Sequence, residues 1–214
     1  MPAIVGAAGL HFPTDDTAVL DKGQFQLEGW VLYTDSRNGE FAALPAVGIG
    51  GSVELAMGLL RVREDGEYSN RLEPEAKWRL PLELPAGWSA ALGVIAGVEE
   101  GRLEDWFVNL PLSYEFGAAP LALHLNAGWL RTRDSVRGSV DRVFTGIGAE
   151  WDLAPRLGLI GQAYREGAES EPEAQAGLRL ALGEHLELLD IVVGRPLRGD
   201  DKGWFVVAGF AALF

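Results

Sequence analysis

Hydrophobic and polar residues alternate with a period of two along almost all of the chain after residue 23. In LALHLNAGW, residues 121–129, the odd positions carry leucine, alanine or tryptophan, and the even positions carry small or polar residues. The segment EPEAKWRLPLEL, residues 73–84, separates apolar from charged positions still more strictly. Because successive side chains of a β-strand point to opposite faces, this period predicts an all-β protein.

The alternating segments predict about twelve strands, most of them long enough to cross a hydrocarbon layer at a tilt. Their expected ranges are 24–34, 41–50, 53–63, 73–84, 88–99, 105–116, 120–132, 142–153, 156–166, 172–182, 185–195 and 203–214. Charged residues at alternate positions cannot face a packed apolar core. We therefore expect the apolar face of each strand to meet lipid and the polar face to line a water-filled interior.

The connections are expected to differ between the two ends of the molecule. Odd-numbered strands are followed by polar segments such as TDSRNGE and RTRDSVRGSVDR, and even-numbered strands by short turns such as GGS and LAPR. This pattern predicts a single antiparallel transmembrane β-barrel with short periplasmic turns, longer external loops and both termini in the periplasm. Closure also removes the exposed edges that an open sheet would have.

Two parts of the chain are expected. Residues 24–214 form the barrel domain, and residues 1–23 form an N-terminal periplasmic segment, either the remnant of a signal peptide or a plug in the barrel mouth. A tail lying at the surface is the alternative. LELLDIV, residues 186–192, is expected to contain a one-residue slip in the strand pattern.

Composition narrows the function further. The chain has 31 acidic and 18 basic residues, a net charge of −13, which argues against nucleic-acid binding because phosphate contacts need clustered cations. It has no cysteine and three histidines that are far apart in sequence. These counts predict neither a metal site nor a cofactor.

With the apolar face outward, the interior of the barrel is predicted to be lined by polar groups and to carry more acid than base. The candidate lumen-lining residues are Glu28, Glu75, Lys77, Arg79, Asn109, Glu115, His124, Asn126, Glu150, Asp152, Gln162, Gln175 and Arg179. One interpretation is a narrow passive channel that favours cations or small polar or aromatic solutes. The alternative is a closed structural or surface-interaction barrel, in which Lys77, Arg79 and Arg179 pair with carboxylates and fill the lumen.

An enzymatic role is a further alternative, because some barrels of this size are outer-membrane lipid hydrolases. Such an enzyme needs a serine and a histidine within hydrogen-bond reach on the lipid-facing side. The candidates here are His124, Asn126 and Ser113, and the alternation points all three inward. We therefore predict that the protein is not an enzyme.

Aromatic residues lie mostly near the predicted strand ends, as in the girdles of membrane barrels. The residues concerned are Trp30, Trp78, Trp88, Trp106, Trp129, Trp151, Trp204, Tyr33, Tyr114 and Phe214. In the last segment Trp204, Phe210 and Phe214 share one face with apolar residues at every second position. This ending resembles the C-terminal signal read by the bacterial barrel-assembly machinery, which implies that machinery and outer-membrane lipids as partners and the outer membrane as the location.

A second resemblance lies in HFPTDDTAVLDKGQFQLEGWVLYTD, residues 11–35. Its distinctive residues are Pro13, Thr14, Asp15, Asp16, Gly23, Phe25, Gln26 and Glu28. Together with VELAMGLLR and HLELLDIVVGRPLRGDDKGWFVVAGF, this stretch resembles small Gram-negative outer-membrane transporters of the phenol-degradation meta-pathway type, although GIGGSVEL lacks the longer turn typical of them. The resemblance implies an outer-membrane barrel with a transport role. We expect the barrel to be a monomer.

Overall fold

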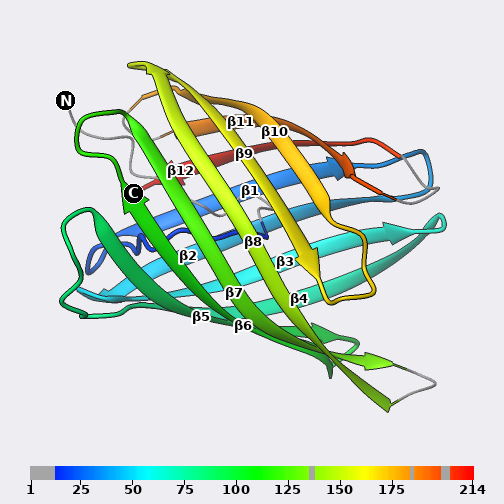
Figure 1. Cartoon of the computed structure of the whole chain (residues 1–214). Helices are drawn as coiled ribbons and strands as arrows, with labels where there is room; N and C mark the ends of the chain where they lie inside the picture. Colours follow the sequence, from blue (N-terminus) through cyan, green and yellow to red (C-terminus); the bar gives the residue numbers. More distant parts are fainter. Residues whose placement is uncertain (1–12, 135–137, 184–185, 199–202) are drawn as a thin grey trace.

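The computed structural model describes residues 13–134, 138–183, 186–198 and 203–214 (Figure 1). They form twelve strands: β1 Phe25–Tyr33, β2 Gly39–Gly50, β3 Val53–Glu64, β4 Glu67–Arg79, β5 Trp88–Glu99, β6 Arg102–Glu115, β7 Leu121–Asp134, β8 Gly138–Ala154, β9 Leu157–Glu166, β10 Glu173–Ala181, β11 Leu186–Pro196 and β12 Phe205–Leu213. Within these residues no helix is long and apolar enough to cross a membrane.

Each strand pairs in antiparallel fashion with the strands before and after it, and β1 pairs with β12 to close the barrel. At the seam Gln26 lies opposite Leu213, and the backbones of Phe25 and Phe214 exchange hydrogen bonds of 3.2 and 2.8 Å. The barrel domain therefore begins and ends at the same rim, on the left of Figure 1. The predicted fold class, a closed antiparallel barrel of twelve strands, is confirmed.

The predicted bounds of the fourth strand were wrong. We expected residues 73–84, whereas β4 spans Glu67–Arg79. Asp65 and Gly66 have φ values of 50° and 89°, as a two-residue hairpin turn requires, so the polar stretch after β3 continues the sheet. Residues 80–87 form the connection to β5, since two prolines in this stretch cannot donate the hydrogen bonds of a strand.

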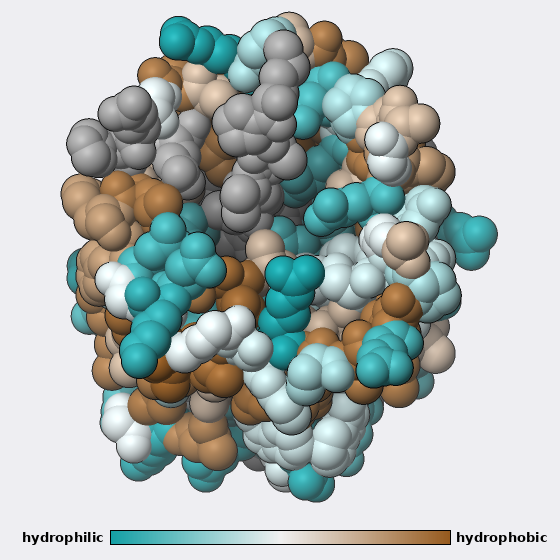
Figure 2. Space-filling view, turned by 90° about the vertical axis from the view of Figure 1, so that its left-hand side faces the viewer, coloured by the Kyte–Doolittle hydropathy of each residue, from teal (hydrophilic) through white to brown (hydrophobic). Residues whose placement is uncertain are grey.

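The outer face of the barrel is apolar over the length of the strands. In β3, for example, Leu55, Met57 and Leu59 are exposed on the outer face. Gly58 and Leu60, which alternate with them, are buried. A soluble monomer rarely exposes apolar patches this large. Figure 2 views the barrel from the rim at which β1 begins and β12 ends, and it shows hydrophilic residues at the mouth of a hollow. This distribution suits a wall with lipid outside and water inside.

Aromatic pairs lie on this outer face near both rims. Trp88 and Tyr114 have ring centroids 4.8 Å apart near the rim with the termini, and Trp106 and Trp129 have centroids 4.5 Å apart toward the other rim. Trp30, which we expected in such a girdle, is instead 7% exposed and lies inside the barrel. Its place two residues after the buried Glu28 puts both side chains on the luminal face.

One wall of the interior is apolar, a feature that we did not predict. The buried cluster comprises Trp30, Ala42, Leu44, Leu60, Ile160, Val192 and Val207. The register of β11 against β12 shifts between Leu186 and Leu188, which confirms the predicted slip. Beyond the shift, Leu188, Asp190 and Val192 are all buried. The lumen therefore has an apolar side and a polar side.

Candidate functional site: the N-terminal segment and the acidic vestibule

Residues 13–22, which we call the N-terminal segment, run inside the barrel. The backbone N–H and the hydroxyl of Thr14 both donate to Oε1 of Gln162, at 3.0 and 2.6 Å. The N–H of Asp15 donates to Oδ1 of Asn126 at 2.9 Å, and Nδ2 of Asn126 donates back to the carbonyl of Asp15 at 2.8 Å. Gln162 and Asn126 thus bind this backbone as a strand partner would. The first twelve residues of the predicted segment 1–23 lie outside the described residues.

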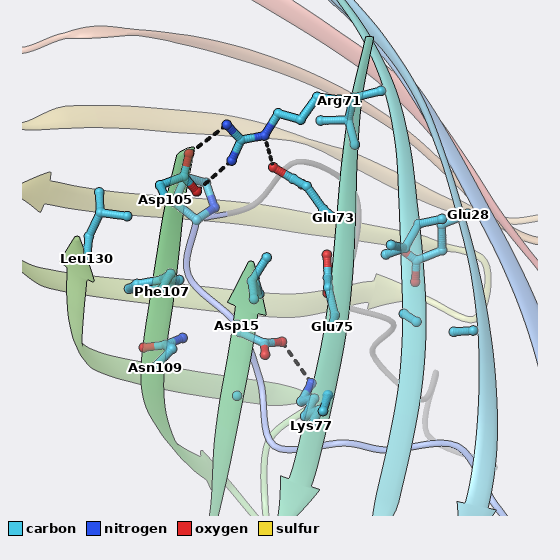
Figure 3. Close-up of a pocket in the computed structure, with 18 of the residues that line it drawn as sticks. Asp15, Glu28, Arg71, Glu73, Glu75, Lys77, Asp105, Phe107, Asn109 and Leu130 are labelled. Carbon is cyan, nitrogen blue, oxygen red and sulfur yellow. Dashed lines mark hydrogen bonds and ion pairs between the residues drawn. The ribbon is translucent and has the colours of Figure 1, made fainter. Parts of the chain in front are cut away.

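Ionic and polar contacts join the same segment to the opposite wall. Nζ of Lys77 lies 2.8 Å from Asp15 (Figure 3) and 2.9 Å from Asp16, and both carboxylates are largely buried. The hydroxyls of Thr17 and Ser89 are 2.5 Å apart. Further along, the N–H of Leu20 donates to Glu54 at 2.9 Å. The segment is therefore held by β3, β4, β5, β7 and β9, and it crosses the lumen.

The end of the segment depends on a glycine in β2. The N–H of Gly23 donates to the carbonyl of Gly48 at 2.8 Å, and the N–H of Gly48 donates to the carbonyl of Gln24 at 3.1 Å. A β-carbon at Gly48 would collide with the backbone oxygens of Leu20 and Asp21. Only glycine lets the two backbones approach this closely.

We therefore expect Gly48→Ala to loosen the N-terminal segment without unfolding the barrel. The added methyl group must displace the Leu20–Asp21 backbone, because those oxygens belong to main chain and not to a flexible side chain. Limited proteolysis of the folded variant in detergent should cut the segment at least about threefold faster, since a local opening easier by ~0.7 kcal/mol has that effect. Gly50→Ala, where a β-carbon meets nothing within 4 Å, is the matched control. Equal cleavage of both variants would contradict this reading of Gly48.

Beyond the segment lies a cavity of about 340 Å³, which we call the vestibule. Its charged lining is strongly unbalanced, with eight acidic residues and two basic ones: Asp15, Glu28, Glu40, Glu54, Glu73, Glu75, Asp105, Glu166, Arg71 and Lys77. Its apolar lining includes Trp30, Leu44, Leu60, Phe107 and Phe144. Asp15 of the N-terminal segment forms part of its floor, so the segment separates the vestibule from the rim that carries the termini.

Both basic residues of the vestibule are already bound to carboxylates. Arg71 makes a bidentate pair with Asp105, with both N–O distances at 2.7 Å, and lies 2.6 Å from Glu73 (Figure 3). Lys77 is held by Asp15 and Asp16, as described above. Among the described residues no ion pair joins a cation to Glu28, Glu54 or Glu75. The vestibule therefore has more carboxyl groups than cations to pair with them.

A separate ion-pair cluster lies deeper in the wall. Arg179 of β10 is 3% exposed and contacts Asp190 at 2.7 Å and Glu150 at 3.0 Å. Its Nε also donates to Asp190 at 3.0 Å. The luminal charges therefore include an ion-pair group of the kind expected for a filled interior, on the strands β8, β10 and β11.

Ser113 and His124 form a hydrogen bond of 2.8 Å between Oγ and Nδ1. Both are buried in the lumen, as the alternation predicted, and neither faces lipid. Asn126 does not complete a triad with them, because its amide is bound to Asp15 and its Oδ1 also accepts from Asn109 at 2.6 Å. A lipid hydrolase would need this pair on the other face of the wall.

The predicted lumen residues are found at three levels of burial. Seven are buried: Glu28, Asn109, His124, Asn126, Gln162, Gln175 and Arg179. Four are half-buried: Glu75, Lys77, Glu150 and Asp152. Arg79 and Glu115 are exposed at the strand ends of the rim that carries the termini. Trp204, Phe210 and Phe214, predicted as an assembly signal, are exposed on the outer face.

Several vestibule residues were missed. Arg71 falls before the predicted strand 73–84, Glu73 begins it, and Asp105 begins the predicted strand 105–116. The alternation of polar side chains nevertheless runs back through Ser69, Arg71, Glu73, Glu75 and Lys77, and following it would have found the first two. Trp30 was assigned to a girdle by residue type, although its parity with Glu28 places it in the lumen.

A family model described as "Uncharacterised conserved protein UCP029691" matches residues 3–212 of the sequence. The chain belongs to this family. Among curated proteins no sequence matches it closely enough to count as a relative. The match does not extend to the phenol-degradation type of transporter, so that likeness remains a resemblance of particular segments.

Solved structures share the fold at low sequence identity. The "KdgM porin" aligns with a TM-score of 0.71 and 10% identity, over 88% of this chain and 99% of that one. The same porin "in complex with disordered oligogalacturonate" aligns at 0.65 and 8% identity, over 89% and 98%. The "COG4313 outer membrane channel from Pseudomonas putida F1" aligns at 0.64 and 10% identity, over 95% and 100%. The fold is thus that of porin-like outer-membrane barrels.

Proposed function

We propose that this protein is a passive channel of a Gram-negative outer membrane that passes small solutes and prefers cations. The observation that carries the proposal is the vestibule, a luminal cavity of about 340 Å³ with eight acidic and two basic lining residues. A cleft lined by one sign of charge within a low-dielectric wall concentrates ions of the opposite sign. The porin-like fold supports a transport role, and outer-membrane lipids and the assembly machinery are the partners proposed with it.

The charge of the vestibule separates this protein from one of its structural neighbours. The solved KdgM complex contains oligogalacturonate, a chain of carboxylate-bearing sugars. Glu28, Glu54 and Glu75, without cationic partners, would repel such a polyanion. We therefore propose small cationic or neutral solutes in place of acidic oligosaccharides.

The N-terminal segment is the barrier in this proposal. Its contacts with Lys77, Asn126 and Gln162 close the path below the vestibule, so passage requires the segment to move or to leave a narrow gap beside it. If it never moves, the protein is the closed structural or surface-interaction barrel, which is the second candidate that this observation favours. Because Ser113 and His124 pair inside the lumen and away from lipid, we propose no hydrolase activity.

A planar bilayer with a salt gradient tests the proposal. With refolded protein and 0.1 M KCl on one side against 1 M on the other, we expect discrete conductance steps. The reversal potential should have the sign expected when potassium crosses more readily than chloride. Selectivity should weaken when both sides are raised to molar salt, because the screening length falls from about 10 Å to about 3 Å. Replacing both Glu28 and Glu75 by glutamine should shift the reversal potential toward zero, and Glu67→Gln on the exposed outer hairpin should not. A folded but silent barrel, or one that prefers chloride, would contradict a cation channel.

A further inference from the structure

We propose that the vestibule is a binding site for a small organic ammonium ion with an apolar body. This inference rests on the proposed channel function and names the class of solute for the same site. The ammonium group would lie between Glu28 and Glu75, and the apolar body would lie against Trp30, Phe107 and Phe144.

The first argument is an excess of hydrogen-bond acceptors. Glu28 is 5% exposed and lines the vestibule, yet its Oε2 has no hydrogen-bond partner. Asn109, 4% exposed and on the same lining, has an Oδ1 without a partner as well. Glu75 extends into the space between Glu73 and Lys77 (Figure 3). An acceptor buried without a donor costs free energy, and a bound cation with several N–H groups would remove that cost.

The second argument distinguishes an organic cation from a metal ion. Among the described residues no three His, Cys, Asp or Glu side chains are grouped closely enough to hold a metal. The acidic groups of the vestibule are instead spread over the N-terminal segment and the strands β1, β2, β3, β4, β6 and β9. Spread acceptors suit a larger cation, which reaches them with separate N–H groups.

The third argument is the aromatic side of the cavity. The rings of Phe107 and Phe144 meet edge to face with centroids 5.3 Å apart, and Trp30 lines the same space from β1. Aromatic faces attract ammonium ions, and apolar side chains bury a hydrocarbon body. The volume of about 340 Å³ lies near the lower end of the range for small-molecule sites, about 300 to 1,000 Å³. Carboxylates and aromatic rings therefore line one cavity, which can bind an ammonium group together with an apolar body.

Titration calorimetry on the full-length protein in detergent tests this site with three probes of similar size. These are 2-phenylethylammonium, 2-phenylethanol and 3-phenylpropanoate, which differ in charge while sharing the ring. We expect saturable binding of the amine, binding of the alcohol weaker by about tenfold or more, and no binding of the acid, because hydrogen bonds to charged groups contribute about 1.5–3 kcal/mol.

Variants locate the bound amine. Glu28→Gln and Glu75→Gln keep the shape of the side chains, and each should weaken amine binding about tenfold while leaving alcohol binding unchanged. Phe107→Leu should weaken binding of both probes. Glu67→Gln, which removes an exposed carboxylate from the β3–β4 hairpin, is the matched control and should have no effect. Heat-modifiable migration on a gel confirms that each variant is folded.

The possible outcomes distinguish a failure of the proposed binding site from a failure of the proposed channel. Amine binding lost in Glu28→Gln and Glu75→Gln supports the site even if the bilayer shows no conductance, in which case the channel proposal alone fails. Equal binding of all three probes, or amine binding that survives both substitutions, overturns the site even if the barrel conducts. Binding of calcium in place of the amine would also overturn it.

Discussion

Removal of residues 1–22 is expected to raise the unitary conductance of the refolded barrel by a factor of about three or more, because a twelve-stranded barrel is wider than the eight-stranded kind that side chains fill. The truncation deletes the backbone that Asn126 and Gln162 bind and the two carboxylates that hold Lys77. We expect the truncated barrel to lack the barrier that crosses its lumen. Single-channel recording in a planar bilayer measures the change directly.

A cross-link provides the opposite test in the intact chain. The chain has no cysteine, so Thr17→Cys with Ser89→Cys introduces the only pair of thiols, at positions whose hydroxyls are 2.5 Å apart. Oxidation should fix the segment across the lumen and suppress conductance, and reduction should restore it. Thr17→Cys alone is the control for the substitution itself. If the truncated barrel stays silent, or the cross-linked one conducts like the reduced one, the segment is not the barrier.

The strands and the closed barrel were predictable because each depends on a local pattern. A period of two requires only that neighbouring residues point to opposite faces, and this holds for Leu55, Met57 and Leu59 whatever the other strands do. The fourth strand was misplaced where polar residues occupy both faces, from Glu67 to Asn70, and alternation loses its contrast. Asp65 and Gly66 then had the composition of a loop although they form a tight turn.

The site was predictable only in part, since its contacts join residues far apart in sequence. The parity of β4 identified Glu75 and Lys77 as luminal, but it gave no means of choosing the partners of Lys77. Those partners, Asp15 and Asp16, lie in a segment without periodicity. Where the segment crosses the lumen, its backbone forms hydrogen bonds with Asn126 and Gln162, which any residue type could make. Such an arrangement leaves little trace in the sequence.

The largest expected loss of stability comes from Asp190→Asn. Asp190 is 1% exposed and is the main partner of Arg179, which it binds through three hydrogen bonds of 2.7–3.1 Å. The substitution removes the charge and leaves the guanidinium buried, with Glu150 as a carboxylate that still pairs with it among the described residues. Breaking a buried ion pair in this way costs about 3–5 kcal/mol. Urea titration of the barrel refolded in lipid vesicles, followed by tryptophan fluorescence, should show the corresponding drop in the free energy of unfolding.

Two further variants test whether that loss of stability comes from leaving the Arg179 guanidinium buried without the charge of Asp190. Asp141→Asn breaks the exposed pair with Arg131, whose N–O distance is 3.3 Å, and should cost less than about 1 kcal/mol. Arg179→Met combined with Asp190→Leu removes both charges and keeps apolar volume, so it should recover most of the stability, because an uncompensated charge costs more than the pair contributes. A double variant as unstable as Asp190→Asn would show that packing around β10 and β11, and not the buried charge, sets the loss. Full recovery would mean that the Arg179 cluster fills space inside the barrel and is not needed for its stability. The N-terminal segment would then be the element that closes the lumen.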